Sequence, residues 1–247
     1  MLSNKLKSFN KKFMKSLDSD YLANFEDREV REMLRYSLDG GKRLRPIIVD
    51  QVVKMMNRNT GNKIDGKYLG IMVELIHTSS LLIDDLPSMD NDDMRRNKLT
   101  LHKKYGTKAA YITANYLFSE AISLAWKLNT KHSIKIVNYI NNQNKKATVG
   151  QYYDLFRTNF KLENETQKVY YSNLKTVPFF TVSFTLPYLL YNYCNDTDIV
   201  YYENLAKYFS YAFQIVDDFE DEEKDKQKKL NNHILFLGKN NAYQLYK

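Results

Sequence analysis

Apolar residues along this chain recur at the three- and four-residue spacing of α-helices, and few breaks separate one helical stretch from the next. Near the N-terminus, five apolar residues follow this spacing and predict an amphipathic first helix: Leu2, Leu6, Phe9, Phe13 and Leu17. Further helices are predicted at 68–85, 106–128, 134–156, 166–176, 178–193 and 198–221, with a bend at Pro187. The pattern predicts an all-α fold, with many helices packed around a central cavity.

The composition agrees with long helices. Among 247 residues, Gly (8) and Pro (4) are scarce, so few turns are indicated. Polar connections are predicted at 57–66 and at 39–46, which ends at Pro46, a usual first-turn residue of a helix. Hydrophobic residues make up 43%, enough for a sizeable core, and we expect one domain over residues 1–247.

The formal net charge of +8 narrows the choice of partners. We expect no nucleic-acid partner, because no basic stripe within a known module is present. We expect no transmembrane segment, because no apolar run approaches roughly 18 residues. A small anionic substrate fits the charge, since it needs only a few cations aimed at one pocket.

The cysteine usage bears on the compartment. The single cysteine, Cys194, excludes an internal disulfide framework and favours a reducing compartment, the cytoplasm. A plastid-like organelle is the alternative, because the N-terminal stretch has no acid before Asp18 and could be a targeting segment.

Two aspartate clusters each follow a long apolar stretch. In the later one, Asp217, Asp218 and Asp221 occur together, and Gln214 lies seven residues before Asp221, close to the same helix face. A solvated helix end would explain such a cluster. However, acids are unfavourable near a helix C-terminus, where the dipole prefers cations, and the residues just before Asp217 are apolar. A metal site is therefore favoured.

The earlier cluster begins with Asp84 and Asp85, and His77 lies about 10 Å before Asp84 along the same helix. Pro87 interrupts regular helical bonding, and the turn that it forces is expected to bring Asp90 back towards Asp84. Oxygen ligands without cysteine or clustered histidine suit Mg²⁺, which binds carboxylates together with substrate phosphate oxygens. Two such clusters predict a diphosphate bridged between them by several Mg²⁺ ions.

Basic residues accompany the aspartates. Lys42, Arg43 and Arg45 lie in the 39–46 segment, and Arg95 and Arg96 follow the first cluster. Arginine binds phosphate oxygens in pairs, and lysine acts as a point charge. A basic loop by itself is usually solvated surface. Here cations and acids recur together, which favours a site for a metal and an anion.

In these motifs and their order, the chain resembles the trans-isoprenyl (polyprenyl) diphosphate synthases of the farnesyl and geranylgeranyl type. The matching segments are GGKRLRP, ELIHTSSLLIDDLPSMDNDDMRRNKLTLHKKYG, GQYYDL, LKT and FQIVDDFED. The first aspartate motif, with four residues between its second and third aspartates and two arginines behind, is highly specific. The resemblance implies an antiparallel helical bundle around a central cavity, the isoprenoid synthase fold, in one polyprenyl synthetase domain.

The resemblance also implies a role for each matching residue. The ligands of several Mg²⁺ ions would be Asp84, Asp85, Asp90, Asp217, Asp218 and Asp221. The diphosphate of isopentenyl diphosphate would be held by Lys42, Arg45, His77 and Arg96, with Lys239 as a late lysine near the substrate. The allylic diphosphate would lie near Arg95, Lys175, Gln151 and Asp154. Polar groups lining the reacting region would be Thr176 and Gln214.

The implied activity is head-to-tail condensation of isopentenyl diphosphate with an allylic diphosphate. Mg²⁺ and the cations would stabilise the leaving diphosphate, so that the allylic C–O bond ionises. The carbocation needs a dry cavity in which the alkene of isopentenyl diphosphate is the nucleophile. No protein residue need form a covalent bond. The catalytic residues implied are Asp84, Asp85, Asp217, Lys175, Thr176 and Gln214.

The side chains before the first cluster bear on product length. Ser79 and Ser80, five and four residues before Asp84, would line the path of the growing chain. Because both are small, geranylgeranyl diphosphate or a longer product is expected over farnesyl diphosphate.

The chain departs from the family pattern at Ile83, Val177 and Ala114–Asn115, and most strongly after Asp221. There we expect the chain to be short and to lack helices that help close the isopentenyl diphosphate site. Two interpretations follow: an active synthase, expected to be a homodimer, or a non-catalytic or regulatory subunit of a heteromeric synthase. Intact aspartate motifs favour the first. The interpretation as a terpene cyclase is weaker still, since a cyclase would not need the anion pocket.

Overall fold

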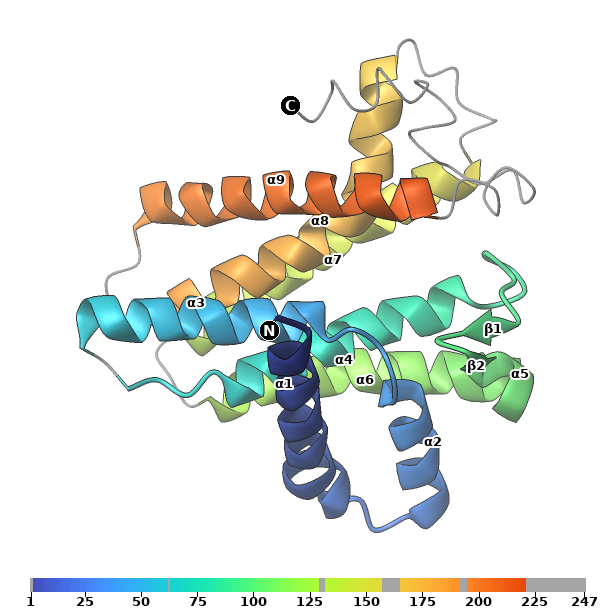
Figure 1. Ribbon diagram of the computed structural model, residues 1–247. Helices are drawn as coiled ribbons and strands as arrows, with labels where there is room; N and C mark the ends of the chain where they lie inside the picture. Colours follow the sequence, from blue (N-terminus) through green and yellow to red (C-terminus); the bar gives the residue numbers. More distant parts are fainter. Residues whose placement is uncertain (1, 62, 129–131, 157–164, 192–194, 221–247) are drawn as a thin grey trace. The chain divides into compact units, whose positions relative to one another are not determined.

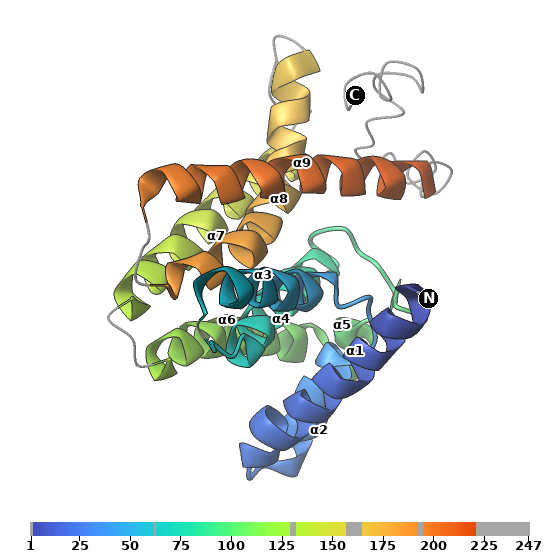
Figure 2. The same cartoon turned by 60° about the vertical axis from the view of Figure 1, so that its left-hand side comes forward.

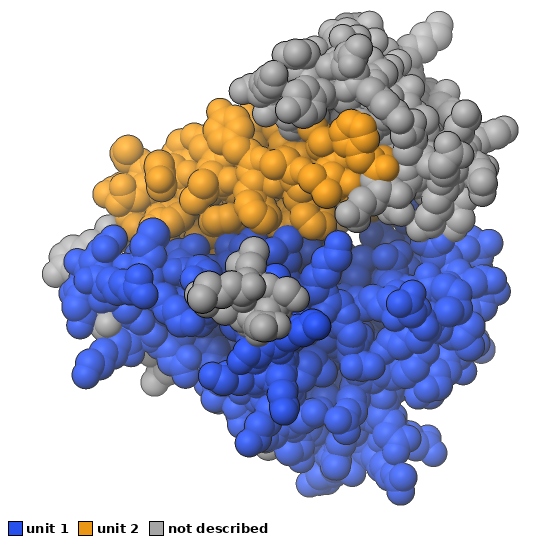
Figure 3. Space-filling model, viewed as in Figure 1, with its two compact units in different colours: residues 1–134 blue, residues 135–247 orange. Residues whose placement is uncertain are grey.

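The computed structural model describes residues 2–61, 63–128, 132–156, 165–191 and 195–220, and these are overwhelmingly helical (Figure 1). The chain divides into two compact units, residues 1–134 and 135–247 (Figure 3). The helices of unit 1 are α1 (Leu2–Ser16), α2 (Arg28–Leu38), α3 (Leu44–Thr60), α4 (Lys67–Asp84), α5 (Leu101–Tyr105) and α6 (Thr107–Lys127). Between α1 and α2 lie a π-helical turn, η1 (Leu17–Tyr21), and a 3₁₀ turn, η2 (Leu22–Asn24).

Helix α4 forms the core of unit 1, with α3 and α6 packed against it (Figure 1). Leu69, Met72 and Leu75 of α4 are fully buried. Small buried residues of α6, such as Ala114 and Ala121, let the two helices approach closely. Each fully buried leucine contributes about 1.5–3 kcal/mol relative to an exposed one. The helix predicted at 68–85 is thus confirmed as a buried helix.

A short hairpin follows α4 and carries the arginine pair. Strand β1 (Met94–Arg95) pairs antiparallel with β2 (Lys98–Leu99), and the two residues between them, Arg96 and Asn97, have φ of 54° and 61°. Positive φ at both central residues is what a type I′ hairpin turn requires. Asparagine tolerates this conformation, whereas for arginine it is unusual. The turn therefore places Arg96 at the hairpin tip in an unusual backbone conformation.

Unit 2 is built from α7 (Ser133–Phe156), which begins at the end of unit 1, α8 (Glu165–Leu189) and α9 (Asp196–Glu220). An aromatic seam joins α8 to α9: the ring centroid of Phe180 lies 5.2 Å from that of Phe209 and 5.3 Å from that of Phe213. The Tyr139 hydroxyl of α7 donates to Glu203 of α9 at 2.7 Å. These contacts hold the three helices together.

Helix α8 corrects one prediction. The sequence suggested separate helices at 166–176 and 178–193, whereas α8 runs unbroken through Pro178 and Pro187 and ends at Leu189. Proline removes one backbone hydrogen bond and crowds the carbonyl four residues earlier, so it kinks a helix that tertiary packing holds together. Helix α8 indeed changes direction along its length (Figures 1 and 2).

The all-α fold class is confirmed, since the described residues contain almost no strand. The first helix, predicted from its apolar spacing, is α1, and its Phe13 is buried. None of the helices in the described ranges is both long and apolar enough to cross a membrane.

Candidate functional site

Unit 1 gathers four arginines around His77 of α4. Nη1 of Arg45, which lies in the first turn of α3, is 3.1 Å from Nε2 of His77. Burial lowers the pKa of His77 well below its usual value, and the charges of Arg45, Arg96, Arg95 and Arg43 lower it further. The imidazole is therefore neutral at physiological pH, and Nε2 accepts a hydrogen bond from Arg45. The proton then lies on Nδ1, which is shielded from solvent without a protein partner.

Arg43 points into the protein rather than to its surface. Its backbone has φ of 53°, and its guanidinium pairs with the buried carboxylate of Glu74 and donates to the carbonyl oxygen of Leu38. The side chains of Arg43 and Glu74 are 1% and 2% exposed. Of the cations in this loop, Lys42 alone is exposed, while Arg43 and Arg45 are buried.

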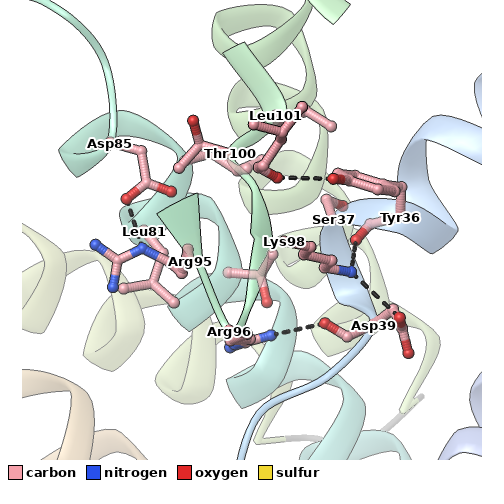
Figure 4. A pocket seen from close by; sticks show the side chains of 13 residues that line it. Tyr36, Ser37, Asp39, Leu81, Asp85, Arg95, Arg96, Lys98, Thr100 and Leu101 are labelled. Carbon is pink, nitrogen blue, oxygen red and sulfur yellow. Dashed lines mark hydrogen bonds and ion pairs between the residues drawn. The ribbon is translucent and has the colours of Figure 1, made fainter. Parts of the chain in front are cut away.

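Arg96 is held against the loop before α3. Its Nη1 donates to the carbonyl oxygen of Asp39 (Figure 4) and to that of Gly40, each at 3.3 Å. Its Nη2 lies 3.9 Å from Oε1 of Glu74. Gly40 and Gly41 have φ of 77° and 86°, and a Cβ on Gly41 would lie 2.7 Å from Cζ of Arg96. Glycine is needed at both positions for the backbone, and at Gly41 also for space.

Tyr36 of α2 binds the hairpin through hydrogen bonds. The Tyr36 hydroxyl donates to the Leu99 carbonyl at 2.7 Å, and Lys98 Nζ donates to the Tyr36 carbonyl at 2.7 Å (Figure 4). The ammonium groups of Lys98 and Lys104 lie 4.4 and 3.8 Å from the Tyr36 ring centroid, which is within cation–π distance. These contacts fix the segment that carries Arg95 and Arg96.

The first aspartate cluster is partly assembled. The backbone N–H of Asp90 donates to the Asp84 carbonyl at 2.9 Å, so the predicted return of the chain after Pro87 is confirmed. Asp85 is buried and its Oδ1 lies 2.5 Å from Nε of Arg95. Burial raises the pKa of Asp85, against the opposing charge of Arg95.

Asp84 and Asp90 are half-buried. Within the described parts of the chain, no three histidine, cysteine or acidic side chains converge in a geometry that could hold a metal ion. Within the first cluster, Asp85 pairs with Arg95. The donor chemistry nevertheless fits Mg²⁺, because all the candidate ligands are carboxylate oxygens.

A small pocket of about 30 Å³ lies between α2, α4 and the hairpin (Figure 4). Its charged lining comes from Asp39, Asp85, Arg95, Arg96 and Lys98. Asp85 of the first aspartate cluster and the arginine pair thus line one charged pocket of unit 1.

The candidate residues of unit 2 form a second network. Lys175 Nζ lies 3.2 Å from Oδ2 of Asp154 on α7. The Thr176 hydroxyl donates to Oε1 of Gln214 at 3.2 Å, and Nε2 of Gln214 donates to Asp218 at 2.8 Å. The structure therefore brings Thr176 and Gln214 together with Asp218.

Asp217 and Gln151 are two further candidates of unit 2. Asp217 is half-buried, and the side-chain amide of Gln151 is shielded from solvent without a hydrogen-bond partner. Asp221, Lys239 and Cys194 lie outside the described residues.

Gly150 of α7 lies directly against the backbone of α8 at the second network. A Cβ at Gly150 would overlap the Leu174 carbonyl carbon and the Lys175 amide nitrogen, and would lie 2.8 Å from the Leu174 oxygen. Pro178, four residues after Leu174, cannot donate a backbone hydrogen bond to that carbonyl. The contact therefore occurs where α8 presents Lys175 and Thr176.

Sequence reasoning missed Glu74, Tyr36 and Gly150. Glu74 carried a signal, because an acid within the apolar run GIMVELI needs a buried cation as its partner. Tyr36 carried none that a single sequence reveals. Gly150 lies in the matching segment GQYYDL, but its contact with α8 depends on long-range packing.

Comparison with known proteins gives consistent matches. The polyprenyl synthetase family model matches residues 27–234. A farnesyl diphosphate synthase of Micrococcus luteus is 32% identical over 231 residues, which cover 90% of this chain and 77% of that protein.

Solved structures agree with these matches. An FPP/GFPP synthase of Zymomonas mobilis superposes with a TM-score of 0.82 at 25% identity, covering 100% of this chain and 90% of that one. A geranyltranstransferase of Thermotoga maritima gives a TM-score of 0.81 at 26% identity, covering 96% and 85% of the two chains.

Proposed function

Because the chain belongs to the polyprenyl synthetase family, we propose that it condenses isopentenyl diphosphate head to tail with an allylic diphosphate. The observation that carries this proposal is the cluster of four arginines around a neutral histidine, beside an aspartate-rich segment. Guanidinium groups bind phosphate oxygens in pairs, and carboxylates suit the divalent cation that accompanies a diphosphate. The similar Micrococcus luteus protein bears the name of such a synthase.

The isopentenyl diphosphate would lie at Lys42, Arg45, His77 and Arg96. His77 Nε2 accepts from Arg45, so its Nδ1–H is a donor that is shielded from solvent and has no protein acceptor. A phosphate oxygen would satisfy it. Lys42 is exposed at the loop and would add a mobile point charge.

Mg²⁺ is the cofactor proposed for both aspartate clusters, with several ions per site. Its candidate ligands are Asp84, Asp85, Asp90, Asp217, Asp218 and Asp221. When bound, Mg²⁺ supplies positive charge that stabilises the departing diphosphate. Asp85 would exchange its ion pair with Arg95 for the metal, and Arg95 would then be available to the allylic diphosphate.

The network of unit 2 supports the same chemistry. Lys175 lies 3.2 Å from Asp154 and would bind the allylic diphosphate. The Thr176 proton is directed to Gln214, so the Thr176 lone pairs remain to stabilise positive charge on the ionised allyl group. The expected product is geranylgeranyl or farnesyl diphosphate.

We propose that the chain forms one catalytic domain and works as a homodimer. The family model spans both compact units, which supports a single domain. Helix α6 exposes large apolar side chains: Tyr111 is 57%, Ile112 63% and Trp126 54% exposed. Apolar surface of this kind favours burial against a second copy.

The test is turnover of labelled isopentenyl diphosphate with an allylic diphosphate and Mg²⁺ by the purified chain. An acid-labile prenyl product soluble in organic solvent is expected. The alternative is a regulatory or non-catalytic subunit of a heteromeric synthase. It would be supported instead if the chain bound isopentenyl diphosphate, formed no product alone, and gave product only with a second synthase subunit.

Substrate roles are separable by single variants. Arg45→Ala should raise KM for isopentenyl diphosphate about 10- to 100-fold, the loss expected for a charged hydrogen bond. Lys175→Ala should act mainly on the allylic substrate. Equal effects of both variants on both substrates would contradict this assignment.

A further inference from the structure

Glu74 is a buried acid that the proposed reaction does not use. It lies one helical turn before His77 on α4, and its side chain is 2% exposed. Burying a carboxylate is unfavourable unless cations and hydrogen bonds surround it. Its carboxylate lies near two arginines of the basic cluster, Arg43 and Arg96.

Two arginines share one oxygen of this carboxylate. Arg43 pairs with Oε1 of Glu74 through Nη1, and Nη2 of Arg96 lies 3.9 Å from the same atom. Arg43 has further partners: its Nη2 donates to the Leu38 carbonyl and lies 3.1 Å from the sulfur of Met14. Arg43 is thus an internal counter-charge with no role towards solvent.

Arg96 is the member of this group that reaches the pocket surface. Its side chain is 17% exposed, and together with Arg95 it lines the small pocket between α2, α4 and the hairpin. Its Nη1 donates to two carbonyl oxygens of the loop at residues 39–41. Its side chain lies close against Gly40 and Gly41, and its Nη2 is attracted by the carboxylate of Glu74. Glu74 is the acid that most favours the charge of Arg96, and without it the like charges of Arg43 and Arg95 would be opposed only by the weaker influence of Asp85.

We propose that Glu74 is a positioning residue for the isopentenyl diphosphate pocket: its carboxylate, anchored by Arg43, holds Arg96 in the orientation that binds diphosphate. This inference rests on the proposed function for the identity of the ligand. It assigns Arg43 an internal role, and it divides the basic residues of the GGKRLRP segment into one anchor, Arg43, and two pocket groups, Lys42 and Arg45.

The test compares Glu74→Gln with wild type in the full chain. The expected result is that KM for isopentenyl diphosphate rises about 10-fold or more, while kcat and the KM for the allylic substrate stay within about 3-fold of wild type. This is the effect expected when one charge-assisted contact to a single substrate is lost. Binding of isopentenyl diphosphate without Mg²⁺, followed by calorimetry, should weaken in parallel. Asp20→Asn is the matched control. It removes the carboxylate that pairs with Lys67 of α4 at 2.9 Å, an ion pair that lies outside the pocket. It should leave both values unchanged.

A second variant separates positioning from charge neutralisation. Glu74→Gln leaves Arg43 buried without its counter-ion, which by itself can destabilise the loop. The double variant Arg43→Met/Glu74→Gln removes that charge, should fold, and should still bind isopentenyl diphosphate about 10-fold more weakly than wild type. Wild-type binding by the double variant would overturn the proposal, since Glu74 would then serve only to neutralise Arg43.

Failure of this inference and failure of the proposed function give different results. If wild type turns over substrate and Glu74→Gln has wild-type KM values, Glu74 has no positioning role and the function stands. If wild type forms no product, yet binds isopentenyl diphosphate and the double variant binds it about 10-fold more weakly, the positioning role stands and the catalytic proposal fails.

Discussion

His77 shows how a single residue depends on its surroundings. Burial and the charges of four arginines hold its pKa well below the ordinary value. The neutral ring accepts a hydrogen bond from Arg45 and keeps a donor for an anion. A protonated ring would instead add a fifth positive charge to the cluster before any substrate binds.

This predicts a specific pH dependence of stability. Because the folded pKa of His77 is depressed, the unfolded state binds the proton first, and stability is lost as the pH falls through and below about 6.5. Urea unfolding at pH 7.5, 6.5 and 5.5 should show wild type losing up to about 1.4 kcal/mol per pH unit relative to His77→Gln, whose side chain does not titrate. Parallel stability profiles for the two proteins would show that His77 is not held neutral by the fold.

At the scale of elements, α8 depends on its contact with α7. Pro178 leaves the Leu174 carbonyl without a helical donor, and Gly150 lets the α7 backbone approach at that point. Asp154, one helical turn after Gly150, then reaches Lys175. The kink and the glycine together set the direction of Lys175 and Thr176.

Gly150→Ala should therefore impair the second network. The added methyl overlaps backbone atoms of α8, which cannot yield as a flexible side chain would, so we expect a loss of about 1–3 kcal/mol in unfolding free energy. We also expect a fall in kcat with the isopentenyl diphosphate KM unchanged. Gly70→Ala is the control: its methyl would meet Phe13 at 3.5 Å, an ordinary contact, and alanine favours the helix. A Gly150→Ala enzyme as stable and active as Gly70→Ala would contradict the close contact.

The packing of α4 on α6 bears on product length. Ser79 is 8% exposed and its hydroxyl donates to the Ala114 carbonyl at 2.8 Å, whereas Ser80 is half-buried and donates to the His77 carbonyl. Ser79→Tyr should shorten the product and, because it overpacks the helix interface, cost about 1–3 kcal/mol of stability. Product analysis and thermal unfolding measure the two effects. Shortening by Ser80→Tyr but not by Ser79→Tyr would place the chain path on the Ser80 side only.

The elements also show what a sequence pattern can reveal. Helices such as α4 and α6 were predictable because their apolar residues recur without interruption. Pro178 misled the prediction of α8, since packing against α9 outweighs the local cost of proline. The hairpin at Arg96 and Asn97 was not predicted, because neither residue is a glycine and the apolar alternation is too short to register.

At the scale of the whole molecule, the two aspartate motifs belong to different compact units. Their sequences indicated a shared chemistry, and the family match across residues 27–234 agrees with it. Sequence alone could name the carboxylates and arginines. It could not show that Asp85 pairs with Arg95, because this depends on the conformation of the intervening loop and hairpin, or that Thr176 donates to Gln214, because this depends on the packing of α8 against α9.

The central claim is that both aspartate motifs serve one reaction. The most direct measurement is turnover of labelled isopentenyl diphosphate at saturating Mg²⁺ by Asp84→Ala, Asp217→Ala and the control Asp93→Asn, whose exposed carboxylate pairs with Lys103 at 2.8 Å. The account predicts that each of the first two variants loses activity by about 100-fold or more while keeping the helical circular dichroism of wild type, and that Asp93→Asn stays near wild type. Wild-type activity in Asp217→Ala would contradict the claim that both aspartate motifs serve the reaction.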